Sequence, residues 1–262
     1  MTIQEMKRRK RELGYSNAKV AELSGVPLGT VQKIFSGETS YPRYATLQAL
    51  EQVLGEPSSI TGKCFVNEST APYLTKKQGD YTLEDYHAFP EDYRIELIDG
   101  VIYNMTAPAS AHQLIAGYIY AQLFNHVAKE QGDCLPMISP IGVQLDCDDK
   151  TMVEPDVIVV CDRDKVINRC VYGAPDFVLE VLSPSTKKKD MIVKLSKYMN
   201  AGVREYWMID PDKKVVSIYD FEHEDYPLIC GFEDNVTVSI LDGQCQIDFK
   251  KMYDYISFLY ED

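Results

Sequence analysis

Three acidic residues interrupt apolar segments that are otherwise typical of buried strands. Glu180 lies within the run FVLEVL, Glu96 lies within IELI, and Asp156 heads the run DVIVV. A buried carboxylate without a partner costs several kcal/mol, so each of these groups must be held by a cation or by hydrogen bonds. Carboxylate oxygens are hard ligands that suit Mg²⁺ or Mn²⁺. The sequence therefore predicts that Asp156, Glu180 and Glu96, on adjacent strands, converge on one divalent cation.

A lysine in the segment after FVLEVL could bring a positive charge to the same place. Apolar residues there recur at spacings of three and four, which predicts a buried helical stripe of Met191, Leu195, Tyr198 and Met199. Lys194 falls on or beside this stripe. The other lysines of the helix are predicted to point elsewhere: Lys188, Lys189 and Lys197. An inward lysine requires a carboxylate or a phosphate, although Lys194 could also be satisfied by Asp190, four residues earlier.

The elements that must position these residues form a mixed order of strands and helices. Strands are predicted at 95–105, as a pair turning at Asp99-Gly100, at 137–145, 156–160, 176–182, 204–210 and 214–221, and near 236–247. Helices are predicted at 82–89, 110–130, 186–202 and near 248–259. A central sheet flanked by helices is the natural packing for this order.

The first fifty-five residues have the pattern of four short helices. Ser16 is a predicted N-cap of the second helix, which ends at Gly25. Pro27 begins the third helix, LGTVQKIF, and Gly37 closes it. A fourth amphipathic helix, TLQALEQVL, follows. The pattern predicts a helix, a glycine turn and a second helix in its centre.

This segment, over roughly residues 3–55, resembles the helix-turn-helix of the Cro/repressor type. The shared features are the glycine between the two helices, the apolar turn residues and the G-x-x-x-x-P segment after the third helix. In that family the third helix enters the major groove of DNA. The resemblance therefore implies DNA contacts at Asn17, Gly29, Thr30, Gln32 and Lys33. A helical bundle used for protein contacts is the alternative.

Five segments between about residues 81 and 220 form a second series: RIELIDG, APASAHQ, EPDVIVV, PDFVLEVLSPST and KLSKYMNAGVREYWMIDP. The series resembles the Uma family, bacterial restriction-endonuclease-like proteins built on the PD-(D/E)XK nuclease core. The resemblance implies an α/β (α+β) core with a central mixed sheet flanked by helices, preceded here by a small all-α domain. It also implies that Asp156 and Glu180 are metal ligands, with Glu96 in the earlier acidic position.

One position departs from the nuclease pattern. The motif places a lysine two residues after the glutamate, where this chain has Leu182. In the Uma pattern a lysine on the following helix takes that place, and Lys194, four residues before Tyr198, matches it.

The implied reaction is metal-dependent hydrolysis of phosphodiester bonds in DNA. Mg²⁺ or Mn²⁺ held by Asp156, Glu180 and Glu96 would polarise a phosphoryl oxygen and activate a water, while Lys194 would orient that water or stabilise the developing charge. No organic cofactor is expected. His112, at the start of the long helix, is a candidate for an outer role, although a lone histidine is more often structural.

Two other functions stay open. The chain could be a DNA-binding transcription regulator whose nuclease-like domain is catalytically silent and serves dimerisation or sensing. The absent strand lysine and the acidic bulk of the chain favour this alternative. A protein-binding adaptor, similar to an antitoxin, is the second. Both resemblances imply a homodimer, because helix-turn-helix sites are often palindromic and restriction-like nucleases often pair to cut both strands.

Charge is divided unevenly along the chain, whose net charge is −13. Residues 1–55 carry eight Lys and Arg against five Glu, a balance of +3, whereas residues 56–262 carry 19 basic against 35 acidic residues. Phosphate contacts need only local positive potential, so the basic part suits DNA. We expect a helix-turn-helix domain at 1–56, a linker rich in Pro, Ser, Thr, Gly and Lys at 57–80, and the nuclease-like domain at 81–262.

The cysteines and the hydropathy pattern predict a cytoplasmic protein. The seven cysteines are scattered, with no C-x-x-C pair and no grouping with histidines, which favours reduced thiols and argues against a zinc site. No stretch approaches the about 20 apolar residues that span a bilayer, so no membrane association is expected.

Overall fold

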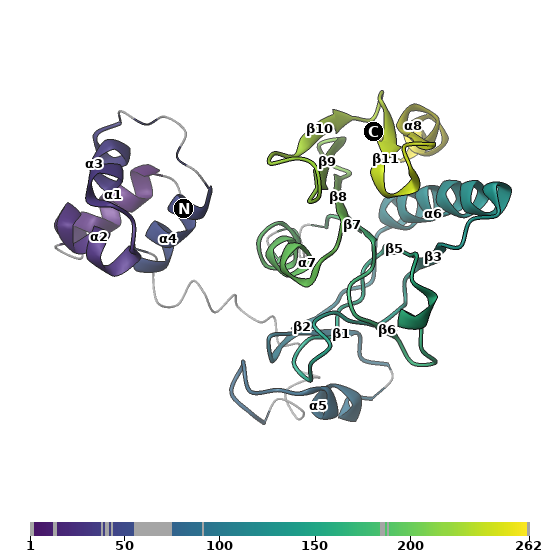
Figure 1. Cartoon of the computed structure of the whole chain (residues 1–262), viewed down its shortest axis with the longest axis horizontal. Coiled ribbons are helices and arrows are strands. Elements are labelled where there is room, and N and C mark those ends of the chain that lie inside the picture. Colours follow the sequence, from purple (N-terminus) through teal and green to yellow (C-terminus); the bar gives the residue numbers. More distant parts are fainter. Residues whose placement is uncertain are drawn as a thin grey trace. The chain divides into compact units, whose positions relative to one another are not determined.

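A computed structural model (Figure 1) describes residues 3–12, 15–37, 39, 42, 44–54, 75–90, 92–183, 187 and 189–260. The chain divides into two compact units, Met1–Cys64 and Phe65–Asp262. Of the linker expected at 57–80, the part before residue 75 lies outside the described residues. Within the described ranges, no helix is both long enough and apolar enough to cross a membrane.

The first unit contains the four helices that the sequence predicts: α1 Ile3–Glu12, α2 Asn17–Ser24, α3 Leu28–Ser36 and α4 Tyr44–Leu54. The Ser16 hydroxyl accepts a hydrogen bond from the backbone N–H of Lys19 at 3.1 Å and caps α2. Gly25 and Gly37 end α2 and α3 in the left-handed region, with φ of 69° and 91°. Buried residues from all four helices form one core: Met6, Val20, Val26, Val31, Ile34, Phe35, Leu50 and Leu54.

The second unit is built on a mixed six-stranded sheet with the order β10-β9-β8-β7-β5-β3. Its strands are β3 Leu135–Ile138, β5 Val157–Val160, β7 Phe177–Val181, β8 Glu205–Asp210, β9 Val215–Asp220 and β10 Leu228–Gly231. Strands β7 and β8 are parallel, and the other neighbouring pairs are antiparallel. Every residue of β5, β7 and β8 is buried, which explains why their sequences are nearly continuous apolar runs.

Helices cover both faces of this sheet, as predicted (Figure 1). They are α6 Ser110–Glu130 and α8 Phe249–Ile256 on one face and α7 Leu195–Ala201 on the other. Helix α5 Leu83–Ala88 packs instead on the β1–β2 strand pair described below, and 3₁₀ turns lie at Arg163–Lys165, Ser239–Leu241 and Ser257–Leu259. Phe177, Leu179 and Val181 of β7 share a core with α6 and α8. Val178 packs with Tyr198 of α7 on the other face. Because side chains alternate along a strand, Glu180 points to the α7 side.

Three two-stranded sheets complete the unit: β1 Ile95–Ile98 with β2 Val101–Asn104, β4 Val143–Gln144 with β6 Val171–Tyr172, and β11 Asn235–Val238 with β12 Cys245–Asp248. The β1–β2 turn at Asp99-Gly100 is where the sequence places it. Gly100 has a φ of 72°, and a Cβ there would lie 2.3 Å from the carbonyl oxygen of Gly79. Glu96 lies on β1, which pairs with β2 in a separate sheet, so it is outside the six-stranded sheet. This corrects the expectation that the three acidic residues are on adjacent strands.

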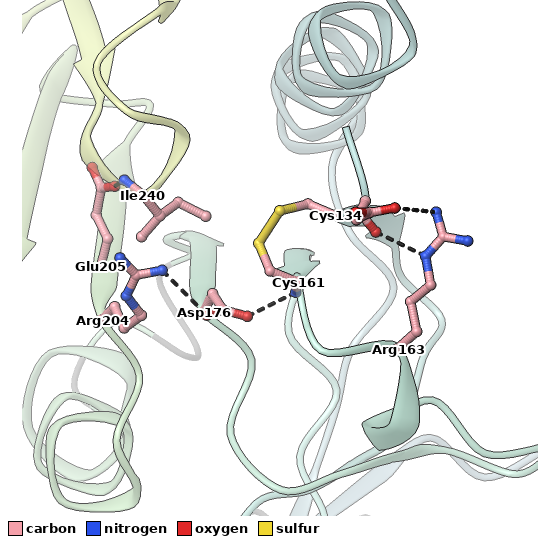
Figure 2. Close-up of a disulfide and its surroundings, with 8 residues drawn as sticks. Cys134, Cys161, Arg163, Asp176, Arg204, Glu205 and Ile240 are labelled. Carbon is pink, nitrogen blue, oxygen red and sulfur yellow. Dashed lines mark hydrogen bonds and ion pairs between the residues drawn. A yellow bond between two sulfur atoms is a disulfide. The ribbon is translucent and has the colours of Figure 1, made fainter. Parts of the chain in front are cut away.

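Two cysteines form a disulfide, so the expectation of reduced thiols is wrong for this pair. The antiparallel register pairs Leu135 of β3 with Val160 of β5, which places Cys134 directly opposite Cys161. Figure 2 shows the bridge and Asp176, whose carboxylate accepts a hydrogen bond from the Cys161 backbone N–H at 2.8 Å. The pairing could not be predicted, because 27 residues separate the two cysteines and only the strand register brings them together.

Candidate active site and DNA-binding surface

Glu180 and Lys194 form a buried ion pair on the α7 side of the sheet. The Lys194 ammonium lies 2.7 Å from Glu180 Oε1, and the Tyr198 hydroxyl donates a hydrogen bond to the same oxygen at 2.8 Å. All three side chains are buried. Burial raises the pKa of the Glu180 carboxyl well above its ordinary value, and the neighbouring carboxylates of Asp190, Asp156 and Glu96 raise it further against the opposing effect of Lys194. The predicted inward lysine is thus placed against a carboxylate.

Asp156 lies at the start of β5, beside β7 in the sheet. Its Oδ2 accepts a hydrogen bond from the backbone N–H of Val181 at 2.7 Å. His112 Nε2, from the first turn of α6, lies 3.1 Å from the same Oδ2. The other oxygen, Oδ1, makes no hydrogen bond or ion pair with the residues that the structure describes. The carboxylate is therefore oriented from one side and open on the other.

Glu96 reaches the same cluster from β1. Its Oε1 lies 2.6 Å from the Lys194 ammonium and accepts the backbone N–H of Glu154 at 2.9 Å. Its Oε2 is bound by the ammonium of Lys189. Burial alone would raise the pKa of the Glu96 carboxyl, but Lys189 and Lys194 lower it to about 2. Both carboxylate oxygens of Glu96 are thus committed to protein donors.

The helix that carries the two lysines differs from the sequence prediction. Residues Lys189–Lys194 form a π-helix, and the α-helix α7 begins only at Leu195. A π-helix closes i→i+5 hydrogen bonds, so residues five apart come near one another. Lys189 therefore turns toward Glu96, although an α-helical pattern points it elsewhere. For the same reason the predicted apolar stripe is wrong in part, since Met191 and Met199 are 41% and 52% exposed.

The cluster holds more carboxylates than ammonium groups. The carboxylates of Glu96, Glu180 and Asp190 lie beside the ammonium groups of Lys189 and Lys194, and the carboxylate of Asp156 is near that of Glu180. When all are ionised, two negative charges are in excess, which is the charge that one divalent cation would balance. Asp156 and Glu180 are the acids with oxygens left over for it, whereas Glu96 has none. In the described part of the chain, no three His, Cys, Asp or Glu side chains are arranged so that they could hold a metal ion. A cation shared by all three predicted ligands stays a prediction.

The DNA contacts that the sequence predicts lie mainly on the exposed face of α3. Val31, Ile34 and Phe35 bury one face of this helix in the core. Gly29, Gln32 and Lys33 are exposed on the other face, and Thr30 is half-buried beside them. Asn17 is half-buried at the start of α2, where its side chain accepts a hydrogen bond from the Lys10 ammonium. The helix-turn-helix geometry therefore leaves Gln32 and Lys33 free to approach a nucleic acid.

The sequence did not indicate the contacts of two residues of the cluster, Lys189 and Tyr198. Lys189 carries no sequence signal, because its inward direction depends on the π-helix. Tyr198 is recognisable as a buried position, but its hydrogen bond to Glu180 follows from the fold. A buried tyrosine hydroxyl needs a polar partner, which is the one signal that could have linked it to a carboxylate.

Comparisons with known proteins agree with this architecture. Residues 83–248 match the Uma2 family, described as "Putative restriction endonuclease", and residues 6–60 match the HTH_3 helix-turn-helix family. An uncharacterised protein of Synechocystis is 29% identical over 154 residues, which cover 57% of this chain and 79% of that protein. A crystal structure of a "putative nuclease belonging to DUF820" from Anabaena variabilis aligns with a TM-score of 0.55 and 21% identity, over 66% of this chain and 98% of that one. Both family resemblances and the fold class are thereby confirmed.

Proposed function

Because the chain belongs to the Uma2 family of restriction-endonuclease-like proteins and also contains a helix-turn-helix domain, we propose that it is a metal-dependent endonuclease that hydrolyses phosphodiester bonds of DNA. The observation that carries this proposal is the meeting of Asp156, Glu180 and Lys194 at one place on the sheet. Two carboxylates can hold a divalent cation, and a lysine beside them can stabilise the charge that develops on a phosphoryl group.

Asp156 and Glu180 are the residues that would hold the cation, Mg²⁺ or Mn²⁺. When bound there, a divalent cation polarises a phosphoryl oxygen and lowers the pKa of a bound water. The chain's own contribution is orientation. The Val181 N–H and His112 fix Asp156 through Oδ2, and Tyr198 fixes Glu180 through Oε1.

Lys194 is the group that we assign to the developing charge. An ammonium group has three N–H donors, and contacts at 2.6 Å and 2.7 Å direct two of them to Glu96 and Glu180. Asp190 Oδ1 lies further away, at 3.8 Å, so in the proposed role the third N–H would donate to the attacking water or to a phosphate oxygen. Lys194 in this role replaces the strand lysine of the nuclease motif, which is Leu182 here.

We further propose that the helix-turn-helix brings DNA to this domain, and that two copies of the chain act together. Support for the first part is the exposed α3 face with Gln32 and Lys33. The second part follows from the two-fold symmetry of many helix-turn-helix sites, and light scattering of the purified chain tests it.

Cleavage of supercoiled plasmid tests the nuclease proposal. The full chain should nick or linearise plasmid with Mg²⁺ or Mn²⁺, and EDTA or Asp156→Ala should abolish this. Asp225→Ala, which removes an exposed carboxylate elsewhere in the same domain, is the matched control and should keep activity. Equal behaviour of wild type and Asp156→Ala across metals and DNA substrates would remove the proposal.

A silent nuclease-like domain in a transcription regulator is the second candidate. The specific observation in its favour is that Lys194 is already bound by two carboxylates while no lysine occupies position 182. This candidate predicts specific DNA binding through the helix-turn-helix with no cleavage under any metal. The plasmid assay combined with a DNA-binding assay therefore separates the two functions.

A further inference from the structure

Glu96, Lys189 and Lys194 form a three-membered unit at the edge of the proposed site. Lys189 and Lys194 are the first and last residues of the π-helix, and both ammonium groups contact the one carboxylate of Glu96. Resting on the proposed nuclease function, we propose that Glu96 and Lys189 are positioning residues that hold the Lys194 amine in place, and that Glu96 is not a ligand of the cation.

The first support is the way in which Glu96 is held. Its side chain is fully buried, and its oxygens are occupied by Lys194, Lys189 and the Glu154 N–H. Strand β1 is fixed next to this contact, because Leu97 and Met152 exchange backbone hydrogen bonds of 2.9 Å and 2.7 Å. Turning Glu96 toward a cation would cost it these contacts and leave two ammonium groups with one carboxylate fewer.

The second support is the surroundings of Lys189. Its side chain is only 10% exposed, and its ammonium lies 5.6 Å from the centre of the Tyr103 ring. Tyr103 of β2 is the direct cross-strand partner of Glu96, so the ring and the carboxylate reach Lys189 from one face of the β1–β2 pair. Burial removes water from a lysine ammonium, and this cost is offset only where groups such as a carboxylate and an aromatic ring take the place of that water.

The third support is the balance of charge. Without Lys189, the single positive charge of Lys194 would face the two negative charges of Glu96 and Glu180, and one negative charge would stay unbalanced. Lys189 balances that charge, and together with Lys194 it keeps Glu96 ionised although the group is buried. The π-helix is what makes this possible, because i→i+5 closure brings the two lysines to the same carboxylate.

Variants of the full chain distinguish a role of Glu96 in positioning Lys194 from a role as a ligand of the cation. Glu96→Gln and Lys189→Met should bind Mn²⁺ like the wild type in an electron paramagnetic resonance titration, whereas Asp156→Asn and Glu180→Gln should lose binding. In cleavage, Lys189→Met should lower kcat about 10- to 100-fold with little change of KM for DNA, and Lys189→Arg should recover part of the loss. Lys197→Met is the matched control, because this lysine of α7 pairs with Asp99 and Asp146 instead.

A measurement that needs no catalysis completes the test. Reductive methylation followed by mass spectrometry reports how accessible the Lys194 amine is. Labelling of Lys194 should rise several-fold in Lys189→Met and stay at the wild-type level in Lys197→Met. Unchanged labelling in Lys189→Met, or loss of Mn²⁺ binding in Glu96→Gln comparable to Asp156→Asn, would overturn the proposal. Wild type that cleaves no DNA would instead remove the nuclease function, while labelling and Mn²⁺ binding would still decide the role of Glu96.

Discussion

In the proposed site, Lys194 takes the role that the nuclease motif gives to a lysine on the strand. In the usual pattern that lysine stands two residues after the glutamate, on the same strand face. Here Leu182 takes that position and packs in the core with Tyr198 and Tyr206, while the ammonium arrives from the π-helix at 2.7 Å from Glu180. The acid and the amine meet because a strand face and the helix covering it share one layer.

Glu205 provides a prediction at the same scale, independent of the proposed site. This carboxyl is buried at the start of β8, where it accepts hydrogen bonds from the Trp207 indole at 2.7 Å and the Ile240 N–H at 3.1 Å. Burial raises its pKa to about 7 from an ordinary value of 4.5, despite these hydrogen bonds. The folded state therefore binds this proton more tightly than the unfolded state.

The unfolding free energy should consequently fall as pH rises from about 4.5 to about 7 and level off above, with this group contributing at most about 3 kcal/mol. Urea unfolding of wild type and Glu205→Gln across this range measures it, because the amide does not titrate. The difference in stability between the two proteins should shift in favour of the variant as pH rises. A constant difference over the whole range would contradict the raised pKa.

The sequence reveals charged residues of the protein interior where a charge interrupts an apolar run. Glu180, Asp156 and Glu96 are visible in this way, and an inward Lys194 follows from helical periodicity. The roles of Lys189 and Tyr198 were not visible, because one depends on a π-helix and the other on a contact between segments far apart. The assignment of Glu96 to a metal used its residue type, its apolar surroundings and the resemblance to the Uma family, and the first two suit a lysine partner equally well.

The strand pair β3–β5 gives a prediction at the scale of elements. The Cys134–Cys161 disulfide joins β3, at the edge of the sheet, to β5, the strand that Asp156 heads (Figure 2). Closing a loop across 27 residues restricts the unfolded chain, so reduction should lower stability by roughly 3 kcal/mol or somewhat less. Urea unfolding with and without a phosphine reductant measures this.

The double variant Cys134→Ser with Cys161→Ser is the control, since its unfolding midpoint should not respond to the reductant. Mass spectrometry must show that the wild type gains two hydrogens on reduction. A reduced wild type with the midpoint of the oxidised protein would mean that the disulfide adds nothing to stability.

Helices and strands were predicted correctly where their periodicity or apolar run is strong. The long helix α6 and the buried strands β5, β7 and β8 lie where periodicity or apolar runs place them. Strand β10 was not predicted, because Leu228 and Ile229 are both exposed at the sheet edge and no alternation marks the segment. The π-helix was missed because 3.6-residue periodicity cannot represent an inserted residue.

At the scale of the whole molecule, the two units carry opposite charge. The first 55 residues have a balance of +3 within a chain of net charge −13. DNA binding should therefore rest on few phosphate contacts, and we expect Lys33 on the exposed face of α3 to make one of them. Lys33→Ala should weaken binding and reduce the slope of log K against log salt by about 1.

Fluorescence anisotropy over a salt series measures this slope. Lys250→Ala, which removes a cation paired with Asp254 in the second unit, serves as the control and should leave the slope unchanged. A Lys33→Ala variant with the wild-type slope would exclude this lysine from the DNA contacts.

Soaking Mn²⁺ into crystals tests the proposed cation site itself. Crystals of the full chain soaked in Mn²⁺ should show an anomalous peak bound by both Asp156 and Glu180, and Asp156→Ala crystals should lack it. Glu96 should keep its contacts with Lys189 and Lys194 in both. A peak bound by Glu96, or Asp156 and Glu180 without a shared Mn²⁺ at saturating concentration, would rule out a cation held by Asp156 and Glu180 alone.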